Sequence, residues 1–117
     1  MDFHSAPVFT DDEYARRLSL AHRAMTDCDA DVLVVTDPCN MCWLCGYEAW
    51  SFYVPQALLL VAGRARPIWV GRAIDVEAVH QTTKLVEEDI RCYDDDLVQL
   101  ADGHPASVVA ESIRAEG

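Results

Sequence analysis

The chain has 117 residues, 51% of them hydrophobic, so it is long enough for one domain with its own core. Nine basic and twenty acidic residues give a formal net charge of −11, which argues against general binding to nucleic acid or to anionic membranes. The acidic residues near the start exclude a signal peptide, and the longest uncharged run, 49–63, is too short and too polar to cross a bilayer.

The first predicted element is a helix that follows the lead-in at residues 1–9. Thr10 and Glu13 form a capping box, in which each side chain can bond the other residue's backbone N–H. Apolar residues then recur at helical spacing, so we expect one buried face and a helix that ends near Asp27. Arg16, Arg17 and Arg23 lie off this apolar stripe.

A strand, a short turn or helix and an aromatic loop are predicted next. The unbroken run Val32–Val35 is typical of a strand that is buried on both faces in a parallel sheet. The dipeptide Asp37-Pro38 ends this strand, the tripeptide Cys39-Asn40-Met41 opens a short turn or helix, and Gly46 is a natural stop for it. Residues 47–54 are predicted as the loop.

The second half of the chain predicts a hairpin followed by alternating helices and strands. Residues 56–62 and 67–70 are expected to pair through a turn at 63–66. A helix over 74–84, with Ile74, Ala78 and Val79 facing inward, a strand over 86–93 and a last helix over 105–115 follow. This order predicts an α/β fold with a mixed sheet flanked by helices. Because an α/β alternation would enter its next strand after Gly117, we expect a piece of a longer protein.

Cys39, Cys42 and Cys45 recur at every third residue and are the first candidates for chemistry. Thiolates at this spacing can share a zinc ion or an iron–sulfur cluster, provided that a fourth ligand is available. No fourth cysteine follows locally, so we favour three small thiols that pack around a turn. With five cysteines and no secretory signal, reduced thiols in a cytoplasm are expected.

An aromatic stretch and a polar pair are the other candidate sites. Half of the ten aromatic residues lie within residues 43–53, which indicates either core packing or the wall of a small-molecule pocket or subunit interface. Arg72 and Asp75 follow the third predicted strand. The arginine can clamp a carboxylate, and the aspartate can cap the next helix.

Taken together, these segments resemble the N-terminal domain of the creatinase/prolidase family. The closest resemblance is to the subgroup that contains ectoine hydrolase and related Xaa-Pro-dipeptidase-like enzymes. The relatives more often have a small or hydroxylic residue at position 39 and threonine at position 45, which fits the packing interpretation of the cysteines. The matching motifs are Glu13-Tyr14-x-x-Arg17-Leu18, the strand and turn from Asp31 to Tyr47 with Asp37-Pro38-x-Asn40 and Gly46-Tyr47, residues 50–56, and Arg72 with Asp75.

The resemblance implies a ribonuclease-H-like α/β domain over residues 1–117 and a pita-bread catalytic domain that this chain lacks. It implies that the parent is a hydrolase that cleaves a C–N bond of a small amide, such as an Xaa-Pro dipeptide or an ectoine- or creatine-like compound. Peptidase members hold two metal ions in the catalytic domain, whereas creatinase-type members work without metal. We therefore expect no cofactor in this chain, and a divalent metal only in the missing domain.

The resemblance also implies a homodimer in which this domain helps to close the partner's active site. By that analogy the substrate-binding residues are Tyr47, Trp50, Phe52 and Arg72, and no catalytic residue or metal ligand lies in this chain. Two alternatives stay open. The chain could be a stand-alone binding or assembly domain, or a metal- or cluster-binding module that uses the three cysteines.

Overall fold

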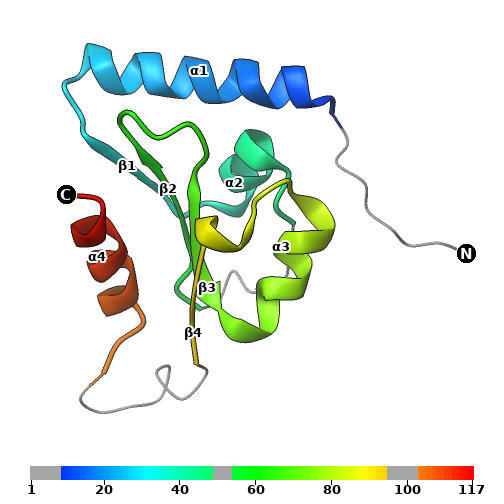
Figure 1. Cartoon of the computed structure of the whole chain (residues 1–117), viewed down its shortest axis with the longest axis vertical. Coiled ribbons are helices and arrows are strands. Elements are labelled where there is room, and N and C mark those ends of the chain that lie inside the picture. Colours follow the sequence, from blue (N-terminus) through cyan, green and yellow to red (C-terminus); the bar gives the residue numbers. More distant parts are fainter. Residues whose placement is uncertain (1–8, 49–53, 95–102) are drawn as a thin grey trace, which may run out of the picture.

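The structure is a computed structural model that describes residues 9–48, 54–94 and 103–117. No helix in the described part of the chain is long and apolar enough to span a membrane. The elements in chain order are α1 (Asp11–Asp27), β1 (Val32–Val35), α2 (Pro38–Cys45), β2 (Ala57–Val61), β3 (Ile68–Arg72), the 3-10 helix η1 (Ala73–Asp75), α3 (Val76–Thr82), the 3-10 helix η2 (Glu87–Asp89), β4 (Ile90–Tyr93) and α4 (Ala106–Ala115) (Figure 1).

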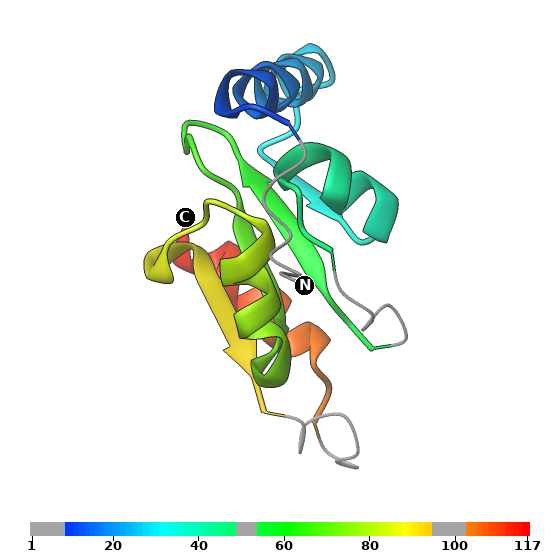
Figure 2. The same ribbon diagram turned by 90° about the vertical axis from the view of Figure 1, so that its right-hand side faces the viewer.

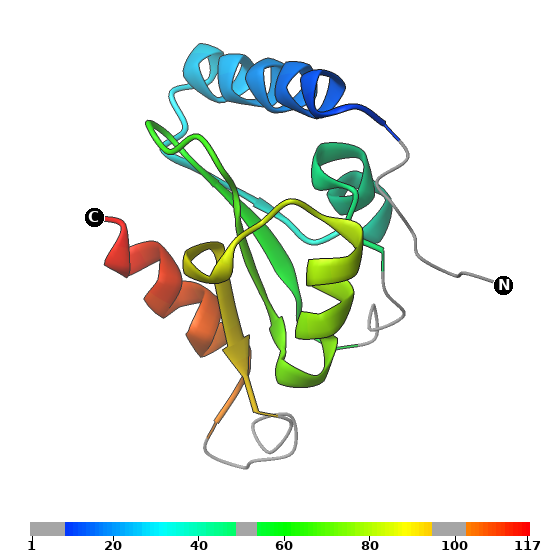
Figure 3. The same ribbon diagram turned by 45° about the vertical axis from the view of Figure 1, so that its right-hand side comes forward.

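The four strands form one mixed sheet in the order β1-β2-β3-β4 (Figure 3). β2 is antiparallel to both β1 and β3, and a hairpin joins it to β3. β3 and β4 are parallel, and α3 makes the crossover between them. The predicted α/β class, with a mixed sheet flanked by helices, is confirmed.

Side chains alternate between two apolar layers, one on each face of the sheet. On one face, Leu58, Leu60 and Trp69 pack with residues of α1, α2 and α3. On the other face, four fully buried residues of β2 and β3 pack against α4. Figure 2 shows α3 and α4 on opposite sides of the strands. The residues of this second layer are Ala57, Leu59, Ile68 and Val70, with Val108, Val109 and Ile113 from α4.

The helix boundaries follow the capping signals of the sequence. Thr10 accepts a hydrogen bond from the Glu13 N–H at 3.2 Å and begins α1. Asp37 accepts from the backbone N–H groups of two residues and begins α2, with Pro38 in its first turn. Gly46 ends α2 at a φ of 86°, a left-handed conformation that suits glycine. A Cβ at this position would lie 2.8 Å from the Thr82 carbonyl oxygen.

The structure corrects the prediction for β1. The strand is antiparallel to β2 and lies at the edge of the sheet, not inside a parallel sheet. Leu33 and Val34, which point to opposite faces, keep 37% and 44% of their surface exposed. An unbroken apolar run indicates burial on both faces only when neighbours cover the strand, and the described part of the chain does not provide them.

Arg17 is buried, although it lies off the apolar stripe of α1. Its guanidinium lies 4.1 Å from the ring centroid of Phe9 and 5.0 Å from that of Trp43. It donates hydrogen bonds to the Trp43 carbonyl oxygen and to the Glu13 carboxylate, both at 3.0 Å. Aromatic faces and these acceptors replace water around the cation, so Arg17 ties α1 to α2.

Two boundaries in the second half differ from the prediction. The chain enters α3 through η1, so the helix begins at Val76, and Ile74 is 67% exposed instead of facing inward. Val79 is fully buried, as expected. The predicted strand over 86–93 begins only at Ile90, because η2 takes up the preceding turn. Acidic residues 87–89 favour a turn over a strand.

Candidate functional site

Two of the four predicted substrate-binding residues lie in the described part of the chain. Arg72 is the last residue of β3 and pairs in register with Tyr93, the last residue of β4. Because these strands are parallel, their carboxyl ends meet at one edge of the sheet, which is where open α/β sheets bind ligands. Trp50 and Phe52 lie outside the described residues.

Tyr47 is held inside the core, immediately after α2. Only 1% of its surface is exposed, and its ring centroid lies 5.6 Å from that of Trp69. Its hydroxyl donates a hydrogen bond to Gln56 Oε1 at 3.0 Å. Burial raises the pKa of this hydroxyl well above its usual range, and the negative charge of Asp75 raises it further. Tyr47 is therefore a neutral hydrogen-bonding group at any physiological pH.

Polar atoms without partners lie close to Tyr47. Gln56 is 94% buried, and its Nε2 has no hydrogen-bond partner among the described residues, nor has the buried Oδ2 of Asp75. Asp75 does not cap α3, which corrects one interpretation of the sequence. Its backbone is already helical because Asp75 is the last residue of η1, whereas a capping residue has an extended backbone. Buried polar groups of this kind are satisfied by bound water or by a polar ligand.

A small cavity of about 400 Å³ opens beside this cluster. It is lined by two residues at the start of α2 together with Cys42, Tyr47 and Glu48. The Glu48 N–H is 3.4 Å from the Thr82 hydroxyl oxygen, so the backbone at the end of this cavity is tied to α3. Glu48 directly precedes in the sequence the segment 49–53, which contains the predicted contacts Trp50 and Phe52 and lies outside the described residues.

The three cysteines of α2 do not converge on one point. The Cys45 thiol is buried and donates to the Met41 carbonyl oxygen, and burial raises its pKa to about 12. Cys39 and Cys42 are exposed residues. The thiol of Cys42 is still partly shielded from water, and this desolvation raises its pKa. Positions three apart on a helix are rotated by about 60°, which spreads the thiols around the axis. In the described residues no three histidine, cysteine or acidic side chains could hold one metal ion. The packing interpretation is correct for Cys45 only.

A buried carboxylate closes the opposite, amino end of β4. Asp89 is fully buried, and it accepts hydrogen bonds from Arg64 at 2.9 Å, from Arg66 at 2.7 Å and from the Val86 N–H at 3.0 Å. Burial alone would raise the pKa of Asp89, but these three donors outweigh it and hold the pKa below its usual value. The cluster fixes the β2–β3 turn against the start of β4.

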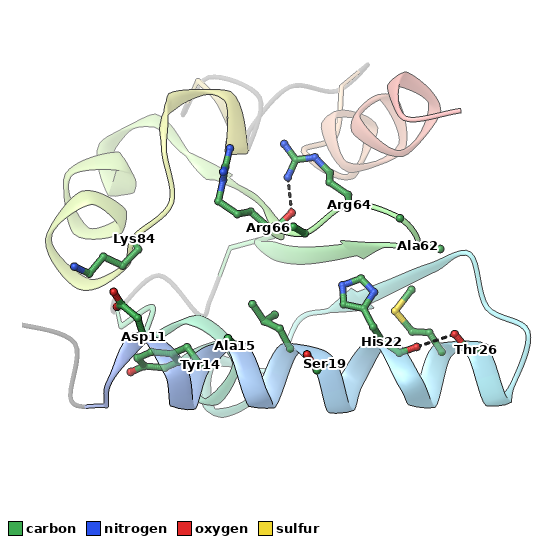
Figure 4. Close-up of a pocket in the computed structure, with 14 residues that line it drawn as sticks. Asp11, Tyr14, Ala15, Ser19, His22, Thr26, Ala62, Arg64, Arg66 and Lys84 are labelled. Atoms are coloured by element: carbon green, nitrogen blue, oxygen red, sulfur yellow. Dashed lines mark hydrogen bonds between the residues drawn. The ribbon is translucent and has the colours of Figure 1, made fainter.

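The same arginines form one wall of a further cavity. This groove of about 810 Å³ runs between α1 and the β2–β3 turn. Figure 4 shows Arg64, Arg66 and Lys84 on one side, facing Tyr14 and His22 of α1. Since both guanidiniums already bind Asp89, the wall is part of a stabilising cluster. Sequence reasoning missed it because Asp89 ends an acidic run that resembles a solvated turn.

The fold defines an α/β domain. Arg72 and the unpartnered polar atoms of Gln56 and Asp75 mark a candidate ligand-binding edge at the carboxyl ends of the parallel strands β3 and β4. Residues 17–116 match the model of the Creatinase/Prolidase N-terminal domain, and the chain belongs to this family. The resemblance inferred from the sequence is thus confirmed.

Two curated relatives and one solved structure place the chain within this family. It is 42% identical over 108 residues to the uncharacterized hydrolase/peptidase y4tM of Sinorhizobium fredii (strain NBRC 101917 / NGR234), covering 92% of this chain and 28% of the relative. It is 42% identical over 105 residues to the ectoine hydrolase of Halomonas elongata, covering 90% of this chain and 26% of the relative. The crystal structure of dipeptidase PepE from Mycobacterium ulcerans superposes with a TM-score of 0.69 at 25% identity, over 89% of this chain and 26% of that one. The chain thus spans about a quarter of the length of the curated relatives.

Proposed function

We propose that this chain is the non-catalytic N-terminal domain of a hydrolase that cleaves a C–N bond of a small amide. The observation that carries the proposal is the 42% identity to an ectoine hydrolase, of which this chain matches only 26%. An ectoine-like amidine or an Xaa-Pro dipeptide is the class of substrate. The catalytic groups, and any divalent metal, would belong to the domain that this chain lacks.

In this proposal the domain contributes substrate contacts from the carboxyl edge of β3. Arg72 offers a charge for a substrate carboxylate, and the unpartnered polar atoms of Gln56 and Asp75 offer further hydrogen bonds. Tyr47 supports this edge from inside the core, and Trp50 and Phe52 complete the predicted set. Ectoine and dipeptides both carry a carboxylate, which a guanidinium recognises well.

The proposal also includes a cytoplasmic homodimer in which the domain covers the active site of its partner. Sedimentation of the chain and of a Trp50→Ala variant tests whether the aromatic loop contributes to the dimer. We expect the variant to dissociate at a higher concentration than the unsubstituted chain. Two monomers of equal sedimentation coefficient would count against this contact.

The decisive experiment is to sequence the native transcript past Gly117, to express the encoded protein and to assay it. We expect a second domain, hydrolysis of ectoine or of Xaa-Pro dipeptides by the whole protein, and none by residues 1–117 alone. In the whole protein, Arg72→Ala should lower kcat/KM by at least about tenfold, since a charged hydrogen bond to substrate is lost.

Arg114→Ala is the matched control, because Arg114 is an exposed arginine in the last turn of α4. It should leave kcat/KM unchanged. If the reading frame ends at Gly117, the alternative of a stand-alone binding or assembly domain replaces the proposal. If both variants are equally active, Arg72 does not contact the substrate.

A further inference from the structure

Two cysteines lie next to each other on the surface of α2, near its start. Cys39 and Cys42 are three positions apart in the helix, and side chains at this spacing are neighbours on a helix surface. Both residues are exposed. Both also line the cavity of about 400 Å³ that contains Tyr47 and Glu48 on its other side. The two cysteines therefore border one common space.

The other cysteines of the chain are placed differently. Cys45 continues the same spacing, but it is buried, and its thiol donates to the Met41 carbonyl oxygen. Cys28 follows the last residue of α1, and its thiol donates to the Met25 carbonyl oxygen at 3.5 Å. Cys92 lies in β4. None of these three lines the cavity, so Cys39 and Cys42 form a separate pair.

The pair has too few ligands for a metal centre. A structural zinc site takes four ligands. In the described part of the chain, no third histidine, cysteine or acidic side chain joins the pair in a group that could hold a metal ion. Two neighbouring thiols without a metal can undergo a two-electron oxidation to a disulfide. The C-x-x-C spacing near the start of a helix is typical of such redox-active pairs.

The helix permits a bond between the two sulfur atoms but does not favour it. Helical residues at this spacing have Cβ atoms about 5–6 Å apart, whereas a disulfide needs about 3.5–4.5 Å. The start of α2 must therefore tighten when the bond forms. The bond closes only the short loop 39–42, so it constrains the unfolded chain little. A strained, exposed disulfide of this kind is readily reduced by other thiols.

The surroundings of Cys42 distinguish the roles of the two cysteines. Desolvation raises the pKa of Cys42, and the negative charges of Glu48 and of an ionised Cys39 raise it further, against a smaller opposite effect of Arg17. The thiolate is the nucleophilic form, so Cys42 is a poor first nucleophile. Cys39 lies in the first turn, where its N–H donates to the Asp37 carboxylate at 2.8 Å. The first attack is therefore assigned to Cys39.

We propose that Cys39 and Cys42 are a redox-active dithiol, which a hydroperoxide oxidises to an intramolecular disulfide. The Cys39 thiolate attacks one peroxide oxygen, breaks the O–O bond and becomes a sulfenic acid, while water or an alcohol leaves. The Cys42 sulfur then attacks the Cys39 sulfur, and the hydroxyl group leaves as water with the Cys42 proton. The two thiols lose two electrons, and the peroxide gains them. Glutathione reverses the step by thiol–disulfide exchange and is itself oxidised.

Oxidation would bring together two of the residues that line the cavity beside Tyr47 and Glu48. The redox state of the pair would therefore alter the shape of this cavity. The inference does not depend on the proposed function, because its test counts thiols and does not measure hydrolysis.

The test uses the protein that the native reading frame encodes, with the 117-residue chain alongside. The reduced protein is treated with one equivalent of hydrogen peroxide, and the remaining thiols are blocked with iodoacetamide. Cleavage before Asp37 and after Trp43 releases the fragment 37–43, whose only cysteines are Cys39 and Cys42. Mass spectrometry should find this fragment two hydrogens lighter and without alkyl groups. After incubation with glutathione, the fragment should carry two alkyl groups.

Three variants separate the roles of the cysteines. Cys42→Ser should stop at the sulfenic acid of Cys39, which dimedone traps. Cys39→Ser should react with peroxide at least about tenfold more slowly than the unsubstituted protein. Cys28→Ser is the matched control at an exposed cysteine outside α2, and it should form the disulfide normally. Circular dichroism confirms that all three are folded.

Three results would overturn the proposal. The first is a fragment 37–43 that still carries two alkyl groups after peroxide treatment. The second is equally slow oxidation of Cys39→Ser and Cys28→Ser. The third is a disulfide that forms in the 117-residue chain but not in the protein of the whole reading frame, because the thiols would then be covered. Hydrolysis is measured separately, so its failure leaves these outcomes distinct.

Discussion

The two edges of the sheet are built in different ways, although each is a strand of only four residues. β4 contains Arg91, which lies 3.8 Å from the carboxylate of Glu116, the residue after α4, and donates to the Glu88 carbonyl oxygen. β1 contains no charged residue and leaves Leu33 and Val34 exposed. Among the described residues, the chain thus closes one edge of the sheet with its own charges and leaves the other edge apolar.

The largest expected effect contrasts the exposed strand with its buried neighbour. Val34 and Leu59 are partners in register, on the same face, but Leu59 is fully buried. Leu59→Ala should lower the free energy of unfolding by about 3–4 kcal/mol, whereas Val34→Ala should lower it by less than about 1 kcal/mol. Urea unfolding at several protein concentrations measures both. Equal losses would show that β1 is covered in solution.

The next largest effect concerns the buried carboxylate beside β4. Asp89→Ala removes the acceptor of two arginines and of the Val86 N–H. The free energy of unfolding should fall by about 2–3 kcal/mol, less than for a fully enclosed pair, because water reaches Arg64 and Arg66. Glu88→Ala, at the exposed neighbouring position, should change it by under about 0.5 kcal/mol. A similar loss in both variants would contradict a specific role for Asp89.

A smaller effect is expected at Gly71, which lies against the side chain of Trp69 in the same strand. A Cβ at Gly71 would lie 2.4 Å from the Cζ2 atom of the fully buried Trp69. Gly71→Ala should therefore destabilise the domain by about 2 kcal/mol through overpacking. In a Trp69→Phe background, which removes the clashing ring, the same substitution should cost distinctly less. Additive losses in thermal unfolding would exclude this contact as the cause.

The smallest expected effect is the pH dependence of folding stability that arises from Asp89 and Glu13. The folded-state pKa of Asp89 lies below its usual value, so the unfolded chain binds more protons as the solution is acidified. The stabilisation from Asp89 is present above the ordinary aspartate pKa, and it is lost as pH falls through the lower folded pKa. Melting temperatures of the unsubstituted chain and of Asp89→Asn should converge on acidification. Glu13, whose pKa the Arg16 and Arg17 hydrogen bonds lower to about 2, should show the same sign. Its effect should be smaller, because water screens it. Melting curves that keep a constant separation would contradict this linkage.

The local signals of the sequence were sufficient for most of the fold. The Thr10 capping box predicted α1, and Gly46 predicted the end of the turn or helix that is α2, because a cap acts within one helical turn. That Asp37 caps α2 is seen only in the structure. The hairpin between β2 and β3 followed from two apolar runs around a short turn. The candidate site was predictable only in part. Arg72 stood out as a charge at the end of a strand, but the unpartnered amide of Gln56 gave no signal in the sequence.

The sequence by itself determined the order of the elements, the helix caps and the family, since these depend on neighbouring residues and on motif spacing. The tertiary structure alone decided which charged side chains are buried. Arg17 and Asp89 resemble solvated residues in the sequence, yet aromatic rings surround one and two guanidiniums bind the other. It also decided that β1 is an exposed edge. Burial is a property of segments that meet in space, and no local pattern specifies which partners a strand will have.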